Sequence, residues 1–530
     1  MQASKRERMT LPADPLALAR GVIGIGFPGS TVDDAPLGVL RDFEPGAFIL
    51  FARNVGTTDE LRALVAALRA TGAPPPLVAV DQEGGRVERL QHGVAQLPAA
   101  MAVGAAGDVL LAERLGTLLG RDLARLGINV DLAPVADLAL QPRSTVIATR
   151  AYGDDPERVA AFAGAFARGL ERGGVAATVK HFPGHGSTAD DSHVALPRVD
   201  ADATRLRARD LIPFQRVLGA DAASLVLTAH VVLEAFDPDR PATLSPAVLT
   251  NLLRGELAYE GVVATDCLEM DAIARGVGTV RGAVLALAAG ADLLWISHRL
   301  ELAHQAAAAI VTAVHGGEIP LARLQDAYAR VRSLRERLAA RTAYDGPLDE
   351  NAPLEAARRA VTVLRGEPRL HPEKPVTVIS FEGTAADNVA LSGGRKRSDE
   401  TPSLSAALRR RGVKSELMRV PLEPLADDVD LLLEHVPALG DREFVIVTCD
   451  AHLHAAQSTA VARILELAPD ALIVSARSPF DATLWPRARR IICIYGAQAI
   501  SLEGCADVLT GRAQPRGKLP VRLPEGAAVR

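Results

Sequence analysis

Val175–His193 reads VAATVKHFPGHGSTADDSH, an apolar run that passes directly into a segment crowded with polar and titratable side chains. The first five residues, Val175–Val179, suit a buried strand. Pro183, Gly184 and Gly186 then require a tight, irregular backbone. We therefore expect a loop at a strand end, where donor and acceptor side chains are held close together.

Asp191 and His193 are separated by one residue in this segment. A carboxylate at that spacing can orient an imidazole and stabilise its charged form. Such a pair suits a group that gives and takes a proton near neutral pH. The alternative interpretation is a histidine-rich loop that binds metal adventitiously or only solvates the end of a barrel.

Two further segments place a carboxylate just after an apolar strand. Val78–Leu90 reads VAVDQEGGRVERL, with Asp81 at the strand end, and Val262–Met270 reads VVATDCLEM, with Asp266 in the same place. Either aspartate alone could simply cap a helix, because aspartate is a favoured N-cap residue. Three polar strand ends in one chain favour a shared functional site.

Together these segments resemble the N-acetyl-β-glucosaminidase branch of glycoside hydrolase family 3. The string Lys-His-Phe-Pro-Gly-His-Gly, which begins at Lys180 and is followed by Asp-x-His, is similar to the signature of that branch. The resemblance implies that Asp266 is the nucleophile and that His193, with Asp191 behind it, is the acid/base. It also implies that Asp81 binds hydroxyls of the terminal sugar. The other substrate contacts that it implies are Arg89, Arg150, Lys180 and His181.

The activity implied by the resemblance is that of a retaining exo-β-N-acetylglucosaminidase, which forms a covalent glycosyl-enzyme at Asp266. The expected substrates carry terminal N-acetylglucosamine on peptidoglycan fragments or chitooligosaccharides. A competing route uses the substrate's own amide as the attacking group, with Asp190 and Asp191 polarising it. The place of Asp191 just before Ser192-His193 favours the dyad instead.

Two other functions stay open on the sequence alone. A phosphorylase could use the same dyad, because a cationic histidine attracts phosphate where a carboxylate acid/base would repel it. The second alternative is a non-catalytic sugar-binding protein, against which the intact set of site residues argues. Ala148-Thr149 stands before Arg150 where the family often has Gly-Asp, and this departure could alter aglycone preference.

Strand-like runs alternate with helical patterns through the first two-thirds of the chain. Repeated β-α units imply an α/β fold with a parallel sheet, and eight strands over about 320 residues suit a TIM-type (β/α)8-like barrel. The charged strand ends then fall where such barrels carry their sites. The expected strands are Val22–Phe27, Ala47–Phe51, Leu77–Val80, Ile128–Leu132, Ala176–Val179, Leu225–Thr228, Val262–Thr265 and Leu293–Ile296.

We expect residues 1–340 to form the catalytic barrel domain. Residues 341–374 mix proline, glycine and charge around a short helix at Leu354–Val363, and we interpret them as a linker. Residues 375–530 resemble the smaller α/β sandwich domain of longer family members. The strands expected there are Val376–Ser380, Phe444–Thr448, Ala471–Val474 and Ile491–Tyr495.

Composition indicates a globular protein. The chain has 530 residues, is 48% hydrophobic and 23% charged, and carries a net charge of −5, which disfavours nucleic-acid binding. No run of about 18 apolar residues predicts a membrane span, and the N-terminal segment lacks the apolar stretch of a secretion signal. We therefore expect a cytoplasmic protein with a small-molecule oligosaccharide as its partner.

The four cysteines lie far apart and show no metal-ligand spacing. Cys267 adjoins the expected nucleophile, but we expect it to pack behind the strand, since free thiols are commonly buried. We expect no metal and no cofactor. The sequence does not indicate the oligomeric state.

Overall fold

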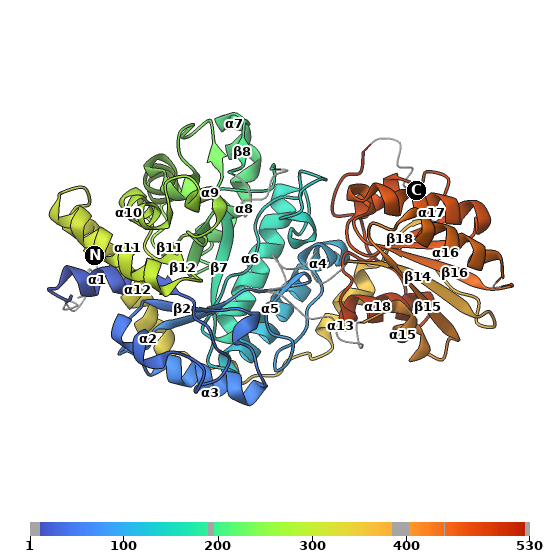
Figure 1. Cartoon of the computed structure of the whole chain (residues 1–530), viewed down its shortest axis with the longest axis horizontal. Helices are drawn as coiled ribbons and strands as arrows, with labels where there is room; N and C mark the ends of the chain where they lie inside the picture. The colour runs from blue at the N-terminus through green and yellow to red at the C-terminus, as the bar shows by residue number, and fades with distance from the viewer. Residues whose placement is uncertain (1–10, 189–195, 384–401, 439, 525–530) are drawn as a thin grey trace.

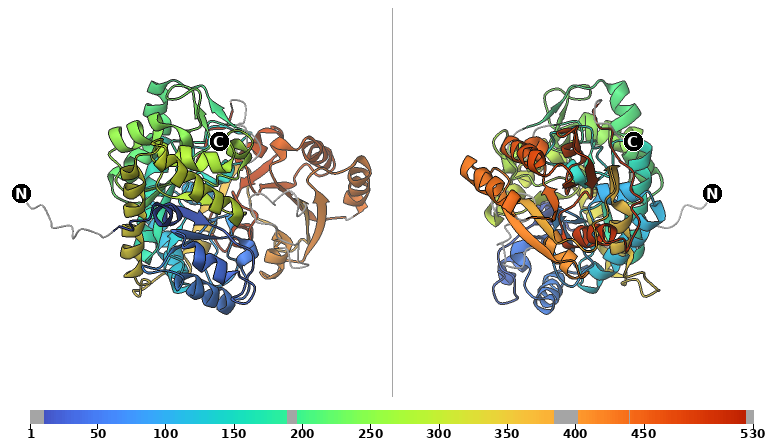
Figure 2. Two further views of the ribbon diagram at one scale, coloured as in Figure 1. Left: turned by 60° about the vertical axis from the view of Figure 1, so that its left-hand side comes forward. Right: turned by 90° about the vertical axis from the view of Figure 1, so that its right-hand side faces the viewer.

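The computed structural model describes residues 11–188, 196–383, 402–438 and 440–524. Two domains lie side by side, and the second domain, orange to red, rests against one side of the first (Figures 1 and 2). Among the described residues, no helix is long and apolar enough to cross a bilayer.

In the part of the first domain that the structure describes, eight parallel strands form a closed barrel. Each strand pairs with its neighbour in the ring, β1 pairs with β12, and a bridge between Ala264 and Leu293 joins the last pair. This confirms the predicted TIM-type barrel. The strands are β1 (Ile23–Ile25), β2 (Ala47–Leu50), β3 (Leu77–Val80), β6 (Val130–Asp131), β7 (Ala176–Phe182), β9 (Leu225–Thr228), β11 (Val262–Ala264) and β12 (Leu294–Ile296).

Alternate side chains of these strands fill the barrel, among them Ile49, Val130, Leu225 and Trp295, while the others meet the surrounding helices. Both faces of the sheet are therefore apolar, as expected for parallel strands. The helices of this domain are α1 (Pro15–Gly21), α2 (Leu37–Phe43), α3 (Thr58–Arg69), α4 (Ala100–Ala106), α5 (Val109–Arg125), α6 (Pro156–Gly173), α7 (Ala203–Arg205), α8 (Ile212–Gly219), α9 (Asp271–Ala274), α10 (Thr279–Ala289), α11 (Leu300–His315) and α12 (Leu321–Ala339).

Local sequence signals set the ends of these helices. At the start of α6, Asp155 accepts a hydrogen bond from the Arg158 N–H at 2.8 Å, and Pro156 occupies the first turn. The helix ends at Gly174, whose φ of 108° favours glycine. Two small sheets lie on the barrel: the antiparallel hairpin of β4 (Gln82–Gly84) and β5 (Val87–Glu88), and the parallel pair β8 (Arg198–Val199) and β10 (Val232–Leu233).

The second domain has a sheet in the order β13-β18-β17-β16-β14-β15, in which β13 is antiparallel to β18 and the other pairs are parallel. This confirms the predicted α/β domain. Its strands are β13 (Thr362–Arg365), β14 (Val376–Glu382), β15 (Ser415–Pro421), β16 (Glu443–Thr448), β17 (Leu472–Ser475) and β18 (Arg490–Cys493). Its helices include α15 (Leu404–Arg409), α16 (Ala426–Ala438), α17 (Ala455–Leu467) and α18 (Ala499–Leu509).

Apolar contacts join the two domains. Met101, Ala102 and Ala105 of α4 pack into the core of the second domain, and α13 (Ala352–Ala360) lies between α4 and α18 (Figure 1). The segment 341–374, which we interpreted as a linker, thus holds a packed helix and the strand β13. The division of the chain at residues 340 and 375 stays a prediction.

Candidate active site

The predicted site residues lie at the carboxyl ends of barrel strands. Asp81 follows β3 and Asp266 follows β11, while Lys180 and His181 are near the end of β7. Because all these strands are parallel in one ring, their carboxyl ends open on the same face. We expected Lys180 and His181 on a loop, but β7 continues to Phe182, which pairs with Thr228 of β9.

Lys180 lies at the centre of a buried charge network. Its Nζ atom is 2.8 Å from Asp81 Oδ1 and 2.5 Å from Glu83 Oε1. Arg89 Nη2 lies 3.5 Å from the other oxygen of Asp81. The Lys180 side chain is only 3% exposed, whereas that of Asp81 is 16% exposed. Asp81 is therefore the more accessible member of this ion pair.

Arg150 extends the same network. Its Nε and Nη2 atoms donate to the two oxygens of Glu83, at 2.8 Å and 2.7 Å. Its Nη2 atom also lies 3.3 Å from His181 Nε2. A guanidinium has no acceptor, so this ring nitrogen must accept and carries no proton.

Asp137 fixes the other side of His181. Its Oδ2 atom lies 2.6 Å from His181 Nδ1 and accepts the His181 backbone N–H at 3.1 Å. Its Oδ1 atom accepts the His185 backbone N–H at 2.6 Å. His181 Nδ1 is therefore the protonated nitrogen. Asp137 acts as an orienting group for a neutral imidazole and for the turn that follows β7.

The network is balanced in charge. Burial alone would raise the pKa of Glu83, but the cations Arg150 and Lys180 hold it well below its usual range. Burial raises the pKa of Asp131 well above its usual value, and the Oδ1 atom of this carboxyl accepts the Gln82 backbone N–H at 3.0 Å. The charged members are then three cations (Arg89, Arg150 and Lys180) and three carboxylates (Asp81, Glu83 and Asp137). Such a site suits an uncharged, polyhydroxylated ligand.

Asp266 stands on the opposite part of the barrel mouth. Its Oδ1 atom accepts the backbone N–H of Cys267 at 2.7 Å, and the Cys267 carbonyl lies 3.0 Å from His230 Nε2. Burial raises the pKa of the Cys267 thiol to about 11, so the thiolate is scarce at neutral pH. The Cys267 thiol is therefore a poor nucleophile at neutral pH and does not compete with the Asp266 carboxylate.

Three side chains near Asp266 are of metal-ligating types. Ligand atoms of Cys267, Glu269 and His298 lie within 4.8 Å of one another. Two guanidinium groups occupy this cluster, however, since Arg53 Nη1 is 3.3 Å from His298 Nδ1 and Arg299 Nε is 3.1 Å from Glu269 Oε1. These cations repel a metal ion, and we assign none.

Asp191 and His193 lie outside the described residues, as does Asp190. The described segment just before them is held by Asp210, which accepts a hydrogen bond from Ser187 Oγ at 3.1 Å and pairs with Arg209 at 2.8 Å. The dyad of Asp191 and His193 thus stays a prediction. The described segment that leads to it follows the end of β7.

Sequence reasoning missed Glu83 and Asp137. Glu83 is two residues after Asp81, and the alternation of an extended chain would have placed both on one face. Asp137 follows a predicted strand, Ile128–Leu132, by five residues, and no local pattern distinguishes it from an ordinary loop aspartate. Only the fold brings it to His181.

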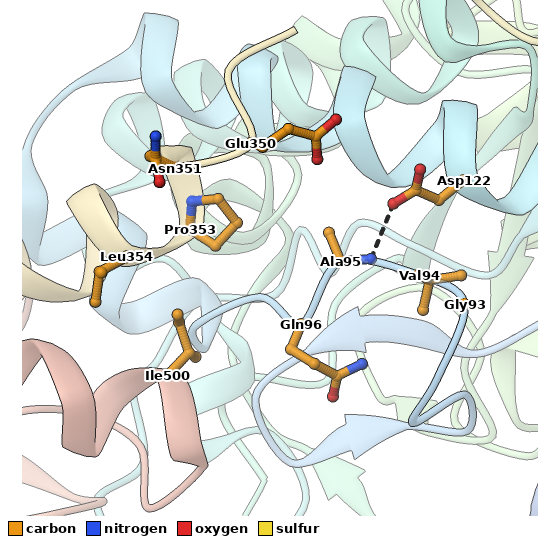
Figure 3. Close-up of a pocket in the computed structure, with 10 residues that line it drawn as sticks. All are labelled: Gly93, Val94, Ala95, Gln96, Asp122, Glu350, Asn351, Pro353, Leu354 and Ile500. Carbon is orange, nitrogen blue, oxygen red and sulfur yellow. Dashed lines mark hydrogen bonds between the residues drawn. The ribbon is translucent and has the colours of Figure 1, made fainter. Parts of the chain in front are cut away.

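A separate crevice of about 450 Å³ opens where the barrel, the segment before α13 and α18 meet (Figure 3). Asp122, Glu350 and Ile500 are among its lining residues, and Asp122 accepts the Ala95 backbone N–H at 2.9 Å. Arg121 pairs with both carboxylates, at 2.7 Å each. None of the lining residues belongs to the charge network around Lys180. The crevice is therefore a feature of the domain junction and is separate from the candidate active site.

Comparison with known proteins identifies the family. The model of the glycosyl hydrolase family 3 N-terminal domain matches residues 28–334. The chain belongs to glycosyl hydrolase family 3. This confirms the predicted family and the predicted enzyme class, a glycoside hydrolase.

Three relatives of this glycoside hydrolase are informative. A protein named β-hexosaminidase from Pseudomonas aeruginosa strain LESB58 is 43% identical over 274 residues, which cover 51% of this chain and 80% of the relative. The structure of a family 3 β-N-acetylglucosaminidase from Paenibacillus sp. str. FPU-7 has a TM-score of 0.89 and 35% identity, covering 97% of this chain and 99% of that chain. The structure of a β-N-acetylhexosaminidase from Beutenbergia cavernae has 30% identity and a TM-score of 0.55. The match covers 61% of this chain and 99% of that chain.

Proposed function

We propose that this family 3 enzyme is a retaining exo-β-N-acetylglucosaminidase that acts through a covalent glycosyl-enzyme on Asp266. The observation that carries the proposal is the balanced network around Lys180, on the same barrel face as Asp266. It offers fixed donors and acceptors to a neutral sugar. The names of the relatives, β-hexosaminidase and β-N-acetylglucosaminidase, support N-acetylglucosamine as that sugar.

The network binds the terminal sugar in this proposal. Asp81, the more accessible carboxylate, accepts hydrogen bonds from sugar hydroxyls. Lys180 and Arg150 donate, and Arg89 supports Asp81 from its other side. His181, fixed as a neutral imidazole by Asp137, shapes the wall of the site.

Two displacements at the anomeric carbon make up the reaction. In the first, a carboxylate oxygen of Asp266 forms a bond to the carbon, the glycosidic C–O bond breaks, and His193 gives its proton to the departing oxygen. In the second, His193 takes a proton from water, the water oxygen attacks the same carbon, and the bond to Asp266 breaks. Asp191 stabilises the charged form of His193.

The expected leaving group is a muramic acid derivative from peptidoglycan or a further chitin-type saccharide. A cytoplasmic location suits the first source. Phosphate could replace water in the second displacement, and the enzyme would then be a phosphorylase. Product analysis in the presence of phosphate separates these reactions, since hydrolysis gives free N-acetylglucosamine and phosphorolysis gives its 1-phosphate.

Trapping of the covalent intermediate tests the proposal. A 5-fluoro-glycosyl probe based on N-acetylglucosamine should label the peptide that contains Asp266, as seen by mass spectrometry. Asp266→Ala should abolish labelling and lower kcat by several orders of magnitude, about 10³-fold or more. Asp271→Asn, five residues further at the start of α9, is the matched control and should label normally. Labelling at another residue, or near-normal turnover by Asp266→Ala, would overturn the assignment.

A further inference from the structure

A long loop of the barrel, residues 139–154, carries Arg150 and contacts the second domain. A hydrogen bond from the Ala139 backbone N–H to the Gly153 carbonyl, at 2.8 Å, closes the base of this loop. The side chain of Ala139 packs against the core of the second domain. Arg150 therefore stands on a closed loop that lies between the barrel and the second domain.

The second domain holds this loop on both sides of Arg150. Before Arg150, the Pro142 carbonyl accepts a hydrogen bond from His452 Nε2 at 2.9 Å. After Arg150, the Asp154 backbone N–H donates to the Pro520 carbonyl at 3.1 Å. The contact at Pro142 is made by a side chain of the second domain, so a substitution can remove it.

Both ring nitrogens of His452, which follows β16, face hydrogen-bond acceptors. A carbonyl oxygen cannot donate, so Nε2 carries the proton that it shares with Pro142. Nδ1 lies 2.9 Å from Asp481 Oδ1. Asp481 is fully buried, and its oxygens also accept the His452 backbone N–H at 3.1 Å and the Thr448 hydroxyl at 2.8 Å. This set of donors suits an ionised carboxylate, and both nitrogens of the ring then donate.

The charges around His452 favour the doubly protonated ring. Burial opposes the charge, but the hydrogen bond and the negative charge of Asp481 raise the pKa of His452 above its usual value. Asp450 also favours the charged ring, and it pairs with Arg477, whose Nη1 atom lies 3.3 Å from Asp450 Oδ2. Hydrogen bonds from charged donors are about twice as strong as neutral ones. The bond to Pro142 is therefore a strong link between the two domains.

A short turn connects Pro142 to the groups that hold Arg150. Ser144 Oγ accepts the Ile147 backbone N–H at 3.3 Å, and the Ile147 carbonyl accepts the Arg150 backbone N–H at 2.8 Å. The Val146 carbonyl accepts a hydrogen bond from Arg150 Nη1 at 3.0 Å. The turn thus fixes both the backbone and one guanidinium nitrogen of Arg150, and it begins where His452 holds the chain.

We propose that His452 is a positioning residue for the candidate active site, because it fixes the loop that places Arg150 against the terminal sugar. This inference rests on the proposed function, in which Arg150 donates to that sugar. Once the loop is released, only a fraction of the molecules presents Arg150 correctly, and the apparent affinity falls by that fraction. KM should then rise while kcat stays nearly unchanged, because the bound sugar restores the arrangement.

Two substitutions in the full-length enzyme separate the two hydrogen bonds of His452. The amide nitrogen of glutamine reaches the position of Nε2, and that of asparagine reaches the position of Nδ1. His452→Gln therefore keeps the bond to Pro142 and loses the one to Asp481, whereas His452→Asn does the reverse. His452→Asn should raise KM for an aryl N-acetylglucosaminide by about fivefold or more and change kcat less than about twofold. His452→Gln should stay within about twofold of the wild type in both constants.

His454→Asn is the matched control, since His454 pairs with Glu423 at 2.6 Å within the second domain and should change neither constant. A rise of KM in His452→Gln alone would mean that His452 serves only the structure of its own domain. That result would overturn the positioning role, as would an equal rise in both His452 variants, no rise in either, or a loss confined to kcat.

Hydrogen exchange of the loop gives a readout that needs no turnover. Peptides from residues 139–147 should exchange faster in His452→Asn than in the wild type, and His452→Gln should exchange as the wild type does. Thermal denaturation checks folding beforehand. Should His452→Asn fail to fold, His452→Leu, which fills similar space without a donor, takes its place with the same expected results.

The two readouts separate failure of this inference from failure of the proposed function. A wild-type enzyme that does not turn over aryl N-acetylglucosaminides would contradict the proposed function, and loop exchange would then decide whether His452 holds the loop. Normal turnover, with loop exchange and KM unchanged in His452→Asn, would contradict the positioning role alone.

Discussion

Glu83 accepts hydrogen bonds from both Nε and Nη2 of Arg150, at 2.8 Å and 2.7 Å. The same carboxylate lies 2.5 Å from Lys180 Nζ, so one buried acid holds two cations that the sequence predicted as substrate contacts. Without it, Arg150 and Lys180 would be buried like charges that lack this shared counter-charge. Glu83 is therefore the residue on which the geometry of the network depends.

Replacement of Glu83 should damage stability and activity together. Glu83→Gln leaves Arg150 and Lys180 as buried like charges, so the free energy of unfolding should fall by about 3 to 5 kcal/mol. kcat/KM should fall by about 10² or more, because both cations lose their positions. Chemical denaturation and aryl glycoside kinetics measure these effects.

Glu336→Gln is the matched control, since its exposed pair with Arg332 on α12 should contribute no more than about 0.5 kcal/mol. The contribution of Glu83 to the free energy of unfolding should also depend on pH. Its folded-state pKa is depressed, so its stabilisation is complete above the unfolded pKa near ~4.3 and is lost as pH falls below it. Near-normal stability of Glu83→Gln would contradict the role assigned to this carboxylate.

His185 should give a second, separate pH dependence. Burial lowers the pKa of His185 to about 4, against about 6.5 in an unfolded chain. Between these values the unfolded state binds a proton that the native state does not, so stability should fall as pH decreases through this window. The loss should reach about 3 kcal/mol at most.

Denaturation midpoints measured between neutral pH and the lower end of this window test the prediction. His185→Gln should show a shallower slope of stability against pH than the wild type. His315→Gln, at the exposed end of α11, should keep the wild-type slope. An unchanged slope in His185→Gln would mean that His185 titrates normally in the native protein.

The strands could be predicted well because they are buried on both faces. Seven of the eight barrel strands fall within the predicted runs, as continuous apolar segments bounded by turn residues should. β7 runs further than predicted because Lys180 and His181 look like loop residues in sequence. In the fold they stay in the strand, since Glu83 and Asp137 supply their partners from distant segments.

Two strands of the second sheet could not be predicted from the sequence. β15 was not predicted, since its alternation of buried and exposed residues is weak in SELMRVP and the strand lies at the sheet edge. The predicted helix also includes the first residues of β13, although the backbone at Val361 is no longer helical and ends α13. Both strands form by pairing with segments from other parts of the chain. A local sequence pattern does not show this pairing.

The acid/base role of His193 can be tested through the leaving group. His193→Ala should reduce turnover of substrates with poor leaving groups far more than that of activated aryl glycosides, whose departure needs little protonation. Azide should partly restore turnover of the activated substrates by replacing water in the second step. Asp191→Ala should show a weaker form of the same pattern, because Asp191 only tunes the imidazole. A uniform loss across all leaving groups would mean that this segment only binds substrate.

Removal of the second domain tests whether catalysis is complete in the barrel. The residues proposed for chemistry all come from the first domain, and 61% of this chain covers 99% of the relative from Beutenbergia cavernae. The structure decides where the cut should fall. α13 packs against α4 and α5, and Glu350 just before it pairs with Arg121, so a protein ending at Val361 should be more stable than one ending at Arg341.

The longer truncation should retain kcat on activated aryl glycosides within about tenfold of full length, a barrier change of roughly 1.4 kcal/mol. Its solubility should be lower, because the cut exposes Met101 and Ala105 of α4, which pack in the second-domain core. Circular dichroism establishes folding before kinetics are compared. A folded truncation without activity on activated substrates would mean that the second domain supplies a catalytic group.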